Sequence, residues 1–476
     1  MADGVAVQYG TTQGRWVIIA AVLGSGVVFL DGTVVNVALP ALSRDLKASV
    51  RGLQWILDGY LVTLSALLLL GGSAGDRYGR RSMFVAGLGG FVVASVLCGL
   101  APGVGFLIVA RALQGVAGAL LVPASLSIIS SAFDGDDRGR AIGAWSGLAA
   151  VAGALGPLLG GWLVDAGSWR LIFFLNVPVA AAAAAIALRH VPETSDDEAG
   201  PLDVTGAALV SAGVALVAYG LIEHSVVAGI AGSAALAAFL LVERRGDHPM
   251  LPLSLFTSGQ FSGANLSTVA VYGAMSAAMF LITLRLQVTL DYSALEAGAS
   301  FLPFTGLMLL LSARVGALAQ RIGPRLPMTV GPLLSAGGLL LFSWIGLGDG
   351  FLTAVLPAVT LFGIGMTVTV APLTAAVLGA VDRRRAGVAS AVNNVAARLA
   401  GLLGIAVIPV VAGFDNGAGL GPSLDTAYPT ALRISAALCG VGAAVAWRFV
   451  RSAAPVRSVT HPDPNHACHD ACVHAA

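Results

Sequence analysis

Asp31, Asp58 and Arg111 each interrupt a separate apolar segment of the chain. If these segments are helices that cross a bilayer, a rise of 1.5 Å per residue puts all three side chains roughly 8–11 Å from the same membrane surface. Charges in hydrocarbon are costly unless they are paired, and they mark ion or proton routes. We therefore interpret Asp31 as the main proton-binding carboxylate and Arg111 as the residue that tunes its proton affinity. Asp58 is a second proton-binding candidate, or a solvated residue at the headgroup interface.

A second set of polar residues forms a stripe closer to the C-terminus. Ser390, Asn394 and Arg398 are spaced at i, i+4 and i+8, which places them on one face of a helix. Arg398 falls near the centre of its apolar segment, and we find no acidic residue in the predicted spans of this half. We interpret the stripe as the wall of a substrate cavity, to which Asn36 and Gln114 also contribute. The alternative is that Arg398 bonds to backbone carbonyl groups.

The elements that position these residues must be membrane-spanning helices. Of the 476 residues, 57% are hydrophobic and 11% are charged, and the mean hydropathy is +0.87. Soluble proteins carry about 25% charged residues, so this composition excludes a soluble enzyme. The apolar residues form repeated blocks of about 20, enough for a helix to cross about 30 Å of hydrocarbon, and they lack the alternation of β-barrel strands. The sequence therefore predicts an all-α, polytopic membrane protein.

A short duplicated segment indicates how the fourteen predicted spans are organised. "GSAGDRYGRR" at 72–81 aligns without a gap with "GALAQRIGPR" at 316–325. Each copy follows the second span of a set of six if the seventh and eighth spans, at 204–222 and 226–243, are an insertion. Such internal duplication is typical of secondary transporters. The predicted regions are an N-terminal six-helix half at 1–190, a two-helix insertion with cytoplasmic linkers at 191–250, a C-terminal six-helix half at 251–450 and a cytoplasmic tail at 451–476.

The distribution of arginine predicts on which side of the membrane the termini lie. An even number of spans puts both termini on one side, and the segments on that side hold most of the arginines, including those of 77–81 and 383–385. Cytoplasmic loops are enriched in Lys and Arg. We therefore expect a multi-pass protein of the cell membrane with both termini in the cytoplasm.

Four sequence motifs stand in order on successive predicted spans. They are "LDGTVVNVALP" at 30–40, the charged loop at 72–81, "RALQGVAGALLVPAS" at 111–125, and "GALGPLLGGW" at 153–162 with its continuation "SWRLIFFLNVP" at 168–178. Together they resemble the motifs of the major facilitator superfamily, and in particular of its fourteen-helix drug:proton antiporters. The resemblance covers nearly the whole chain and includes the number of spans. It implies two six-helix halves with a substrate path between them.

The resemblance assigns the charged loop to a cytoplasmic gate. Its signature residues are Gly72, Asp76, Arg77, Gly79, Arg80 and Arg81. The implied role is a charged latch that holds the cytoplasmic ends together while the outer side is open. The alternative is a positive-inside anchor with ordinary surface ion pairs, each worth about 0–1 kcal/mol. Gln320 replaces the aspartate in the second copy, so we expect a weaker or absent latch in that half.

The Gly-Pro motif of the fifth span comprises Gly153, Gly156, Pro157, Gly160 and Gly161. Proline removes one hydrogen bond and bends a helix, and glycines give it a smooth face. The resemblance implies that this face makes a tight, bendable contact between the halves, which limits leak in exchangers. Generic packing of small residues between helices is the alternative.

These features predict a secondary active transporter, not an enzyme: a proton-coupled exporter of amphipathic small molecules, drugs or antibiotics, that works by alternating access. The chain has no Gly-x-x-x-x-Gly-Lys loop, so we expect the proton gradient to supply the energy and no cofactor to be needed. The expected partners are the substrate, protons and the lipid bilayer, with no nucleic acid, and we expect a monomer. The alternatives are a dedicated exporter of one self-made metabolite or antibiotic and, more remotely, a non-transporting membrane sensor.

The tail carries histidines and cysteines that could be mistaken for a metal site. Four of the seven histidines and two of the four cysteines fall in its last sixteen residues. Their spacing matches no closed zinc pattern. We therefore expect no bound metal and a disordered tail.

Overall fold

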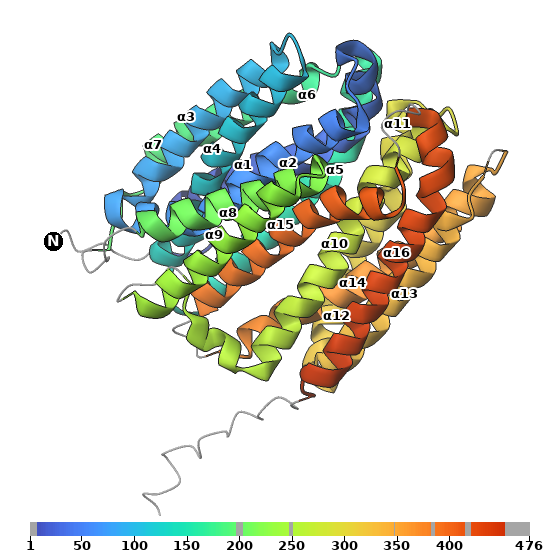
Figure 1. Cartoon of the computed structure of the whole chain (residues 1–476). Coiled ribbons are helices and arrows are strands. Elements are labelled where there is room, and N and C mark those ends of the chain that lie inside the picture. Colours follow the sequence, from blue (N-terminus) through green and yellow to red (C-terminus); the bar gives the residue numbers. More distant parts are fainter. Residues whose placement is uncertain are drawn as a thin grey trace, which may run out of the picture.

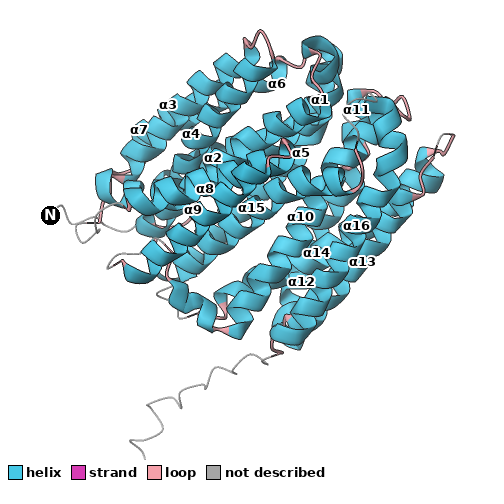
Figure 2. Cartoon of the chain, viewed as in Figure 1, coloured by secondary structure: helices cyan, strands magenta, loops and turns pink. Residues whose placement is uncertain are grey.

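The computed structural model of the chain describes residues 7–196, 203–246, 251–346, 348–381, 386–414 and 420–452. Within these ranges the protein is a bundle of helices without strands (Figures 1 and 2). In the described residues, 13 helices are long and apolar enough to cross a membrane, and the number rises to 14 when the second helix, bent by 52° between Leu68 and Leu70, counts as one span. The prediction of an all-α, polytopic membrane protein with fourteen spans is therefore confirmed.

Six spans form the N-terminal half. They are α1 (Thr12–Leu46), α2 (Val50–Tyr78), α3 (Arg80–Gly99), α4 (Val104–Ala132), α5 (Gly135–Ala166) and the pair α6 (Leu171–Phe174) and α7 (Asn176–His190). Helix α2 packs on α4, α1 packs on α5 and α7, and α3 packs on α4 and α7. The half is thus held together by contacts among its own helices.

The C-terminal half follows the same plan. Its elements are η1 (Leu253–Thr257), α10 (Gly259–Val288), α11 (Ala294–Ala299), α12 (Leu302–Ile322), α13 (Arg325–Ser343), η2 (Phe351–Val355), α14 (Leu356–Leu378), α15 (Ala386–Val411) and α16 (Leu420–Phe449). Helix α13 packs on α14 and α16, and α10 packs on α15 and α16. Figure 1 shows the two halves side by side, with blue to teal helices in one and yellow to red helices in the other.

Two further helices stand between the halves in the chain. Helices α8 (Val204–Ile222) and α9 (Val226–Arg245) pack on each other, and α8 also packs on α2 and α15 (Figure 1). The turn after α8 is fixed to α2, because Glu223 accepts a hydrogen bond from Trp55 Nε1 at 3.0 Å and pairs with Arg51 at 3.6 Å. The insertion therefore covers a seam where the two halves meet.

The two ends of the bundle differ in how the halves are joined. The start of α1 and the end of α16 lie at one end, which we call the terminal end; α6 and α11 lie at the opposite end, the far end (Figure 1). Toward the far end one apolar cluster includes residues of both halves, such as Leu39 and Phe280. Toward the terminal end the clusters are separate, one around Phe84 and the other around Phe261. The halves are therefore packed together at the far end.

Hydrogen bonds between the halves reinforce the far end. Gln54 and Gln287 each donate to a backbone carbonyl of the opposite half, at 2.8 and 2.9 Å. Asp165, at the end of α5, accepts from the first two backbone amides of α11 at 3.2 and 2.8 Å. The first amides of a helix have no partner within it, and they favour a carboxylate. The far end is thus closed by polar as well as apolar contacts.

Three glycines of the Gly-Pro motif pack against α1 of the same half. Thr33 Oγ1 donates to the Gly153 carbonyl at 2.8 Å, and a Cβ at Gly156 would lie 2.0 Å from that hydroxyl oxygen. A Cβ at Gly160 would lie 2.6 Å from Val34 Cγ2. This part of the motif therefore brings α5 close to α1, and it makes the small-residue packing that the sequence left as an alternative.

The same motif touches the other half at Pro157 and Gly161. A Cβ at Gly161 would lie 2.4 Å from the carbonyl oxygen of Ala294 in α11, and a Cβ at Gly298 of α11 would lie 2.1 Å from the Pro157 carbonyl oxygen. The contact between the halves that the resemblance implies is thus made by these two residues of the motif. Its effect on leak stays a prediction.

Gly161→Ala tests this contact. A methyl group at position 161 would meet backbone atoms of α11 at 2.4 to 2.7 Å, and a backbone cannot turn aside as a flexible side chain can. We expect the free energy of unfolding to fall by roughly 1–3 kcal/mol, measured by thermal unfolding of the purified protein in detergent. Gly147→Ala on the same helix is the control, because a Cβ there has no neighbour within 4 Å. Equal effects of the two substitutions would contradict a tight contact.

Candidate functional site

Asp31 of α1 and Arg111 of α4 form a buried salt bridge. Arg111 Nη1 donates to Asp31 Oδ2, and the two side chains are 0% and 1% exposed. A charge without a partner is costly inside a membrane, whereas a hydrogen-bonded pair can be kept there. The structure therefore brings together two of the three charged residues that the sequence places at one depth.

Neutral side chains complete the bonding of this pair. Asp31 Oδ1 accepts from Gln114 Nε2 and from Asn176 Nδ2, both at 2.9 Å. Arg111 Nε donates to the Ile56 carbonyl at 3.1 Å, and its guanidinium carbon lies 4.3 Å from the ring centroid of Tyr60. The pair thus links α1, α2, α4 and α7.

The positions of two of these side chains, Gln114 and Asn176, were not predicted from the sequence. Gln114 was expected on the cavity wall; instead it bonds to Asp31, Arg111 and Ser95 and does not line the cavity. It stands three residues after Arg111 on the same helix, so it shares the face that meets Asp31. Asn176 was not singled out at all, although a lone amide in an apolar block was a signal that could have found it.

Asp58 lies apart from the pair. Its side chain is 0% exposed, and neither carboxyl oxygen has a hydrogen-bond partner among the described residues. It shares one face of α2 with Gln54, which bonds to α15, and with Val62, which packs with residues of α8 and α15. The expectation that Asp58 is solvated at the headgroup interface is therefore wrong, because the inserted α8 covers this face of α2.

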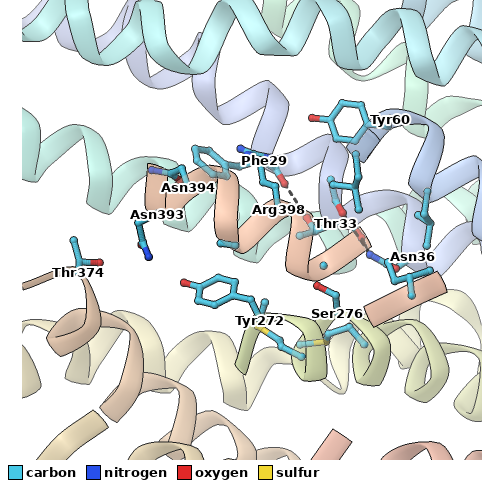
Figure 3. Close-up of a pocket in the computed structure, with 18 of the residues that line it drawn as sticks. Phe29, Thr33, Asn36, Tyr60, Tyr272, Ser276, Thr374, Asn393, Asn394 and Arg398 are labelled. Carbon is cyan, nitrogen blue, oxygen red and sulfur yellow. Dashed lines mark hydrogen bonds between the residues drawn. The ribbon is translucent and has the colours of Figure 1, made fainter. Parts of the chain in front are cut away.

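A cavity lies between the halves beside the charge pair. It has a volume of about 360 Å³ and is lined by helices that include α1, α2, α10 and α15 (Figure 3). It joins a vestibule of about 870 Å³, with which it shares Phe29, Thr374, Ser390 and Asn394. Residues at the end of α2 line the vestibule, so the cavity faces the terminal end. Arg111 reaches its wall, and Asp31 lies behind.

The predicted stripe on α15 lines this cavity. Ser390, Asn394 and Arg398 all contribute to the wall, as does Asn36 from α1. The guanidinium carbon of Arg398 lies 5.7 Å from the ring centroid of Phe29, and Figure 3 shows the two side chains next to each other. Among the described residues Arg398 has no hydrogen bond or ion pair, so none supplies the backbone carbonyl that was the alternative partner.

Other lining residues escaped the sequence analysis. Tyr272 and Ser276 stand four residues apart on α10 and both line the cavity. Asn393, next to the predicted stripe, donates to Thr268 Oγ1 at 2.8 Å. Helical spacing of polar residues in the span at 262–288 was the signal for the first two.

One acidic residue of the C-terminal half also differs from expectation. Asp425 lies inside α16 and pairs with Arg285 of α10, so the spans of this half do contain an acid. The prediction failed because α16 begins at Leu420, earlier than its apolar segment. Arg285 therefore has a counter-ion, whereas Arg398 has none among the described residues.

The charged loop is bonded within its own half. Asp76 and Arg80 pair at 2.9 Å, and Arg81 lies 3.6 Å from Glu193 in the segment after α7. The turn itself needs a left-handed backbone, with φ of +100° at Gly79 and +83° at Gly323 of the second copy. Duplication thus kept the turn in both halves.

The latch implied for this loop is not engaged here. Gly72, Asp76 and Arg80 line the open vestibule, and none of the described ion pairs of the loop reaches the C-terminal half. In the second copy the guanidinium carbon of Arg325 lies 4.1 Å from the ring centroid of Trp447. Arg77 lies beside Tyr78, at 5.7 Å from its ring centroid. The gating role therefore stays a prediction.

The tail from residue 453 onward, with its histidines and cysteines, lies outside the described residues, as do Arg383, Arg384 and Arg385. The expectations of a disordered, metal-free tail and of a basic loop at 383–385 therefore stay predictions.

Comparison with known proteins identifies the family. The profile described as Major Facilitator Superfamily matches residues 21–405, most of the chain. The chain belongs to the Major Facilitator Superfamily. Two solved structures share the fold of this major facilitator protein. The first is a bacterial homologue of the human lysosomal transporter Spinster in an inward-facing, unoccupied conformation; it is 18% identical, with a TM-score of 0.65 over 93% of this chain and 97% of that one. The second is a POT family transporter in complex with 5-aminolevulinic acid; it is 12% identical, with a TM-score of 0.70 over 93% of this chain and 97% of that one.

Curated relatives resemble the chain over most of its length. Multidrug resistance protein Stp of Mycobacterium tuberculosis is 32% identical over 458 residues, which are 94% of this chain and 85% of the relative. The tetracenomycin C resistance and export protein of Streptomyces glaucescens is 34% identical, over 83% and 75%. The puromycin resistance protein pur8 of Streptomyces alboniger is 34% identical, over 94% and 95%. This chain is therefore a multi-pass membrane protein of a transporter family.

Replacing the buried carboxyl group of Asp31 or of Asp58 with an amide should change the free energy of unfolding by different amounts. Asp31→Asn leaves the Arg111 charge buried without its counter-ion, and we expect the free energy of unfolding to fall by roughly 3–5 kcal/mol. Asp58→Asn replaces one unbonded polar group with another of the same shape, and we expect a change below about 1 kcal/mol. Thermal unfolding of the purified variants in detergent measures both. A larger loss for Asp58→Asn would mean that Asp58 carries a bonded charge in the folded protein.

Proposed function

We propose that this major facilitator protein exports amphipathic drugs or antibiotics in exchange for protons. The observation that carries the proposal is the buried Asp31–Arg111 pair, which borders a central cavity closed at the far end and open at the terminal end. A drug-sized cavity between two halves, lined by aromatic and amide side chains, suits such a substrate. The names of the relatives, which state multidrug resistance, tetracenomycin C resistance and export, and puromycin resistance, support it.

The open vestibule is the entry side for substrate in this proposal. The arginines predict that the terminal end faces the cytoplasm of a cell-membrane protein. A substrate then enters past the end of α2, reaches the cavity and leaves when the far end opens and the terminal end closes. Opening the far end requires separation of Asp165 from α11 and of the two glutamine bonds between the halves. The charged loop would close the terminal end.

The charge pair supplies the coupling. In the conformation described, Asp31 accepts hydrogen bonds from Arg111, Gln114 and Asn176. A proton that reaches Asp31 removes its negative charge and weakens these bonds, which join α1, α4 and α7. Protonation and tight pairing with Arg111 therefore exclude each other, so the proton favours one arrangement of the N-terminal half over another. No cofactor is needed for this cycle, since the proton gradient supplies the energy.

The substrate range has two forms within this proposal. A multidrug exporter protects against unrelated compounds, and a dedicated exporter protects against one. The second form is favoured by relatives whose names state a single compound, such as the tetracenomycin C and puromycin proteins. Drug accumulation in an efflux-deficient host, across several chemical classes and with and without a proton uncoupler, separates the two forms.

Transport in proteoliposomes tests the role of Asp31. With a substrate found in the host assay and an imposed pH gradient, we expect Asp31→Asn to lose at least about tenfold of proton-driven transport, because an amide cannot bind and release a proton. Asp349→Asn, at an exposed acid in the loop before η2, is the control and should transport as the wild type does. If Asp31→Asn keeps both the rate and its dependence on the pH gradient, the proton binds elsewhere.

A further inference from the structure

The central cavity has an unbalanced positive charge. Of the described residues that line it, two are cationic, Arg111 and Arg398, and none is acidic. The charge of Arg111 is balanced by Asp31 directly behind it. Arg398 has no ion pair among the described residues, and its guanidinium carbon lies 5.7 Å from the ring centroid of Phe29. The cavity wall therefore presents one net positive charge to a ligand.

The apolar surroundings strengthen the interaction of this charge with a ligand. The cavity lies between apolar helices, where charges interact more strongly than they do in water. The vestibule adds no free acid nearby, because Asp76, the acid among its described lining residues, pairs with Arg80. A cationic ligand in the cavity would meet repulsion that nothing on the described wall relieves. An anionic ligand would instead supply the missing counter-ion.

The geometry around Arg398 fits an oxyanion next to a ring. Arg398 Nε has no hydrogen-bond partner in the part of the chain that the structure describes, and a guanidinium can bind a carboxylate through two parallel hydrogen bonds. Phe29 lies against Arg398, and Tyr272 lines the same cavity from α10 (Figure 3). These rings can pack on an aromatic ligand body, while the Asn36 and Asn394 amides on the wall can bond to its polar groups.

We propose that the exporter selects aromatic amphiphiles that carry an oxyanion, a carboxylate or an ionised phenol, and that Arg398 is the residue that binds this group. The proposal rests on the proposed function and names its substrate class.

The proposed exchange also depends on the membrane potential. Export of an anion and entry of a proton each make the inside of the cell more positive. An inside-negative membrane potential therefore drives the exchange of one anion for one proton, in addition to the pH gradient.

Three matched probes test the charge preference by binding to the purified full-length protein in detergent. They are 2-naphthoate, its neutral methyl ester and the cationic 2-(aminomethyl)naphthalene. We expect the wild type to bind the acid at least about tenfold more tightly than the amine. Arg398→Gln should weaken binding of the acid at least about tenfold and binding of the ester less than about threefold. Arg398→Lys should keep the order of affinities, since it keeps the charge.

Arg314→Gln is the control, because Arg314 is exposed on α12, bonds to the Leu310 carbonyl and does not line the cavity. Tighter binding of the amine than of the acid by the wild type, or an unchanged ratio of acid to ester affinity in Arg398→Gln, overturns the inference. The proposed function fails separately. If no probe or host-assay drug moves in proteoliposomes, export is refuted whatever the binding order; if cationic drugs are exported and acids are not, export stands and the oxyanion preference falls.

Discussion

The pairing of Asp31 with Arg111 is the interaction on which the rest of the structure depends. Two side chains of opposite charge, 0% and 1% exposed, remain in an apolar bundle because each satisfies the other and because Gln114 and Asn176 bond to the remaining carboxylate oxygen. This requirement fixes the mutual position of α1, α4 and α7. It also places a guanidinium on the cavity wall without adding net charge there. A single pair thus determines both the packing of one half and the electrostatics of the path between the halves.

The closed far end follows from a different kind of contact. There the core is shared, and backbone groups of each half accept or donate hydrogen bonds to the other. At the terminal end each half has its own core, and a vestibule of about 870 Å³ separates them. The apolar contacts between the halves are not directional, so they can be exchanged for similar contacts at the opposite end. The alternating access that we propose requires such an exchange of contacts between the two ends.

The sequence predicted correctly that Asp31 and Arg111 lie at one depth in the bundle. It predicted poorly toward which neighbouring helix a side chain points. Helical rise placed Asp31 and Arg111 at one level, and the structure pairs them. The same calculation placed Asp58 at that level, yet Asp58 faces a seam covered by α8, because distance along a helix does not say toward which neighbour a side chain points. Gln114 was misplaced for the same reason. The stripe of Arg398 was found because its spacing defines a face, and the duplicated turn was found because its backbone conformation requires glycine at positions 79 and 323.

The two inserted helices, α8 and α9, contact α2 of the N-terminal half and α15 of the C-terminal half through different kinds of interaction. Among the described residues, the polar contacts between these helices and α2 are made by Glu223 with Trp55 and Arg51. The contacts with α15 are apolar, because Val214 and Ala218 of α8 meet Leu402 in a small apolar cluster. Hydrogen bonds fix a register, but contacts between aliphatic side chains allow sliding. Helices α8 and α9 should therefore move with the N-terminal half as one rigid body, while α15 slides along α8. Lipid would then be kept out of this flank throughout the cycle.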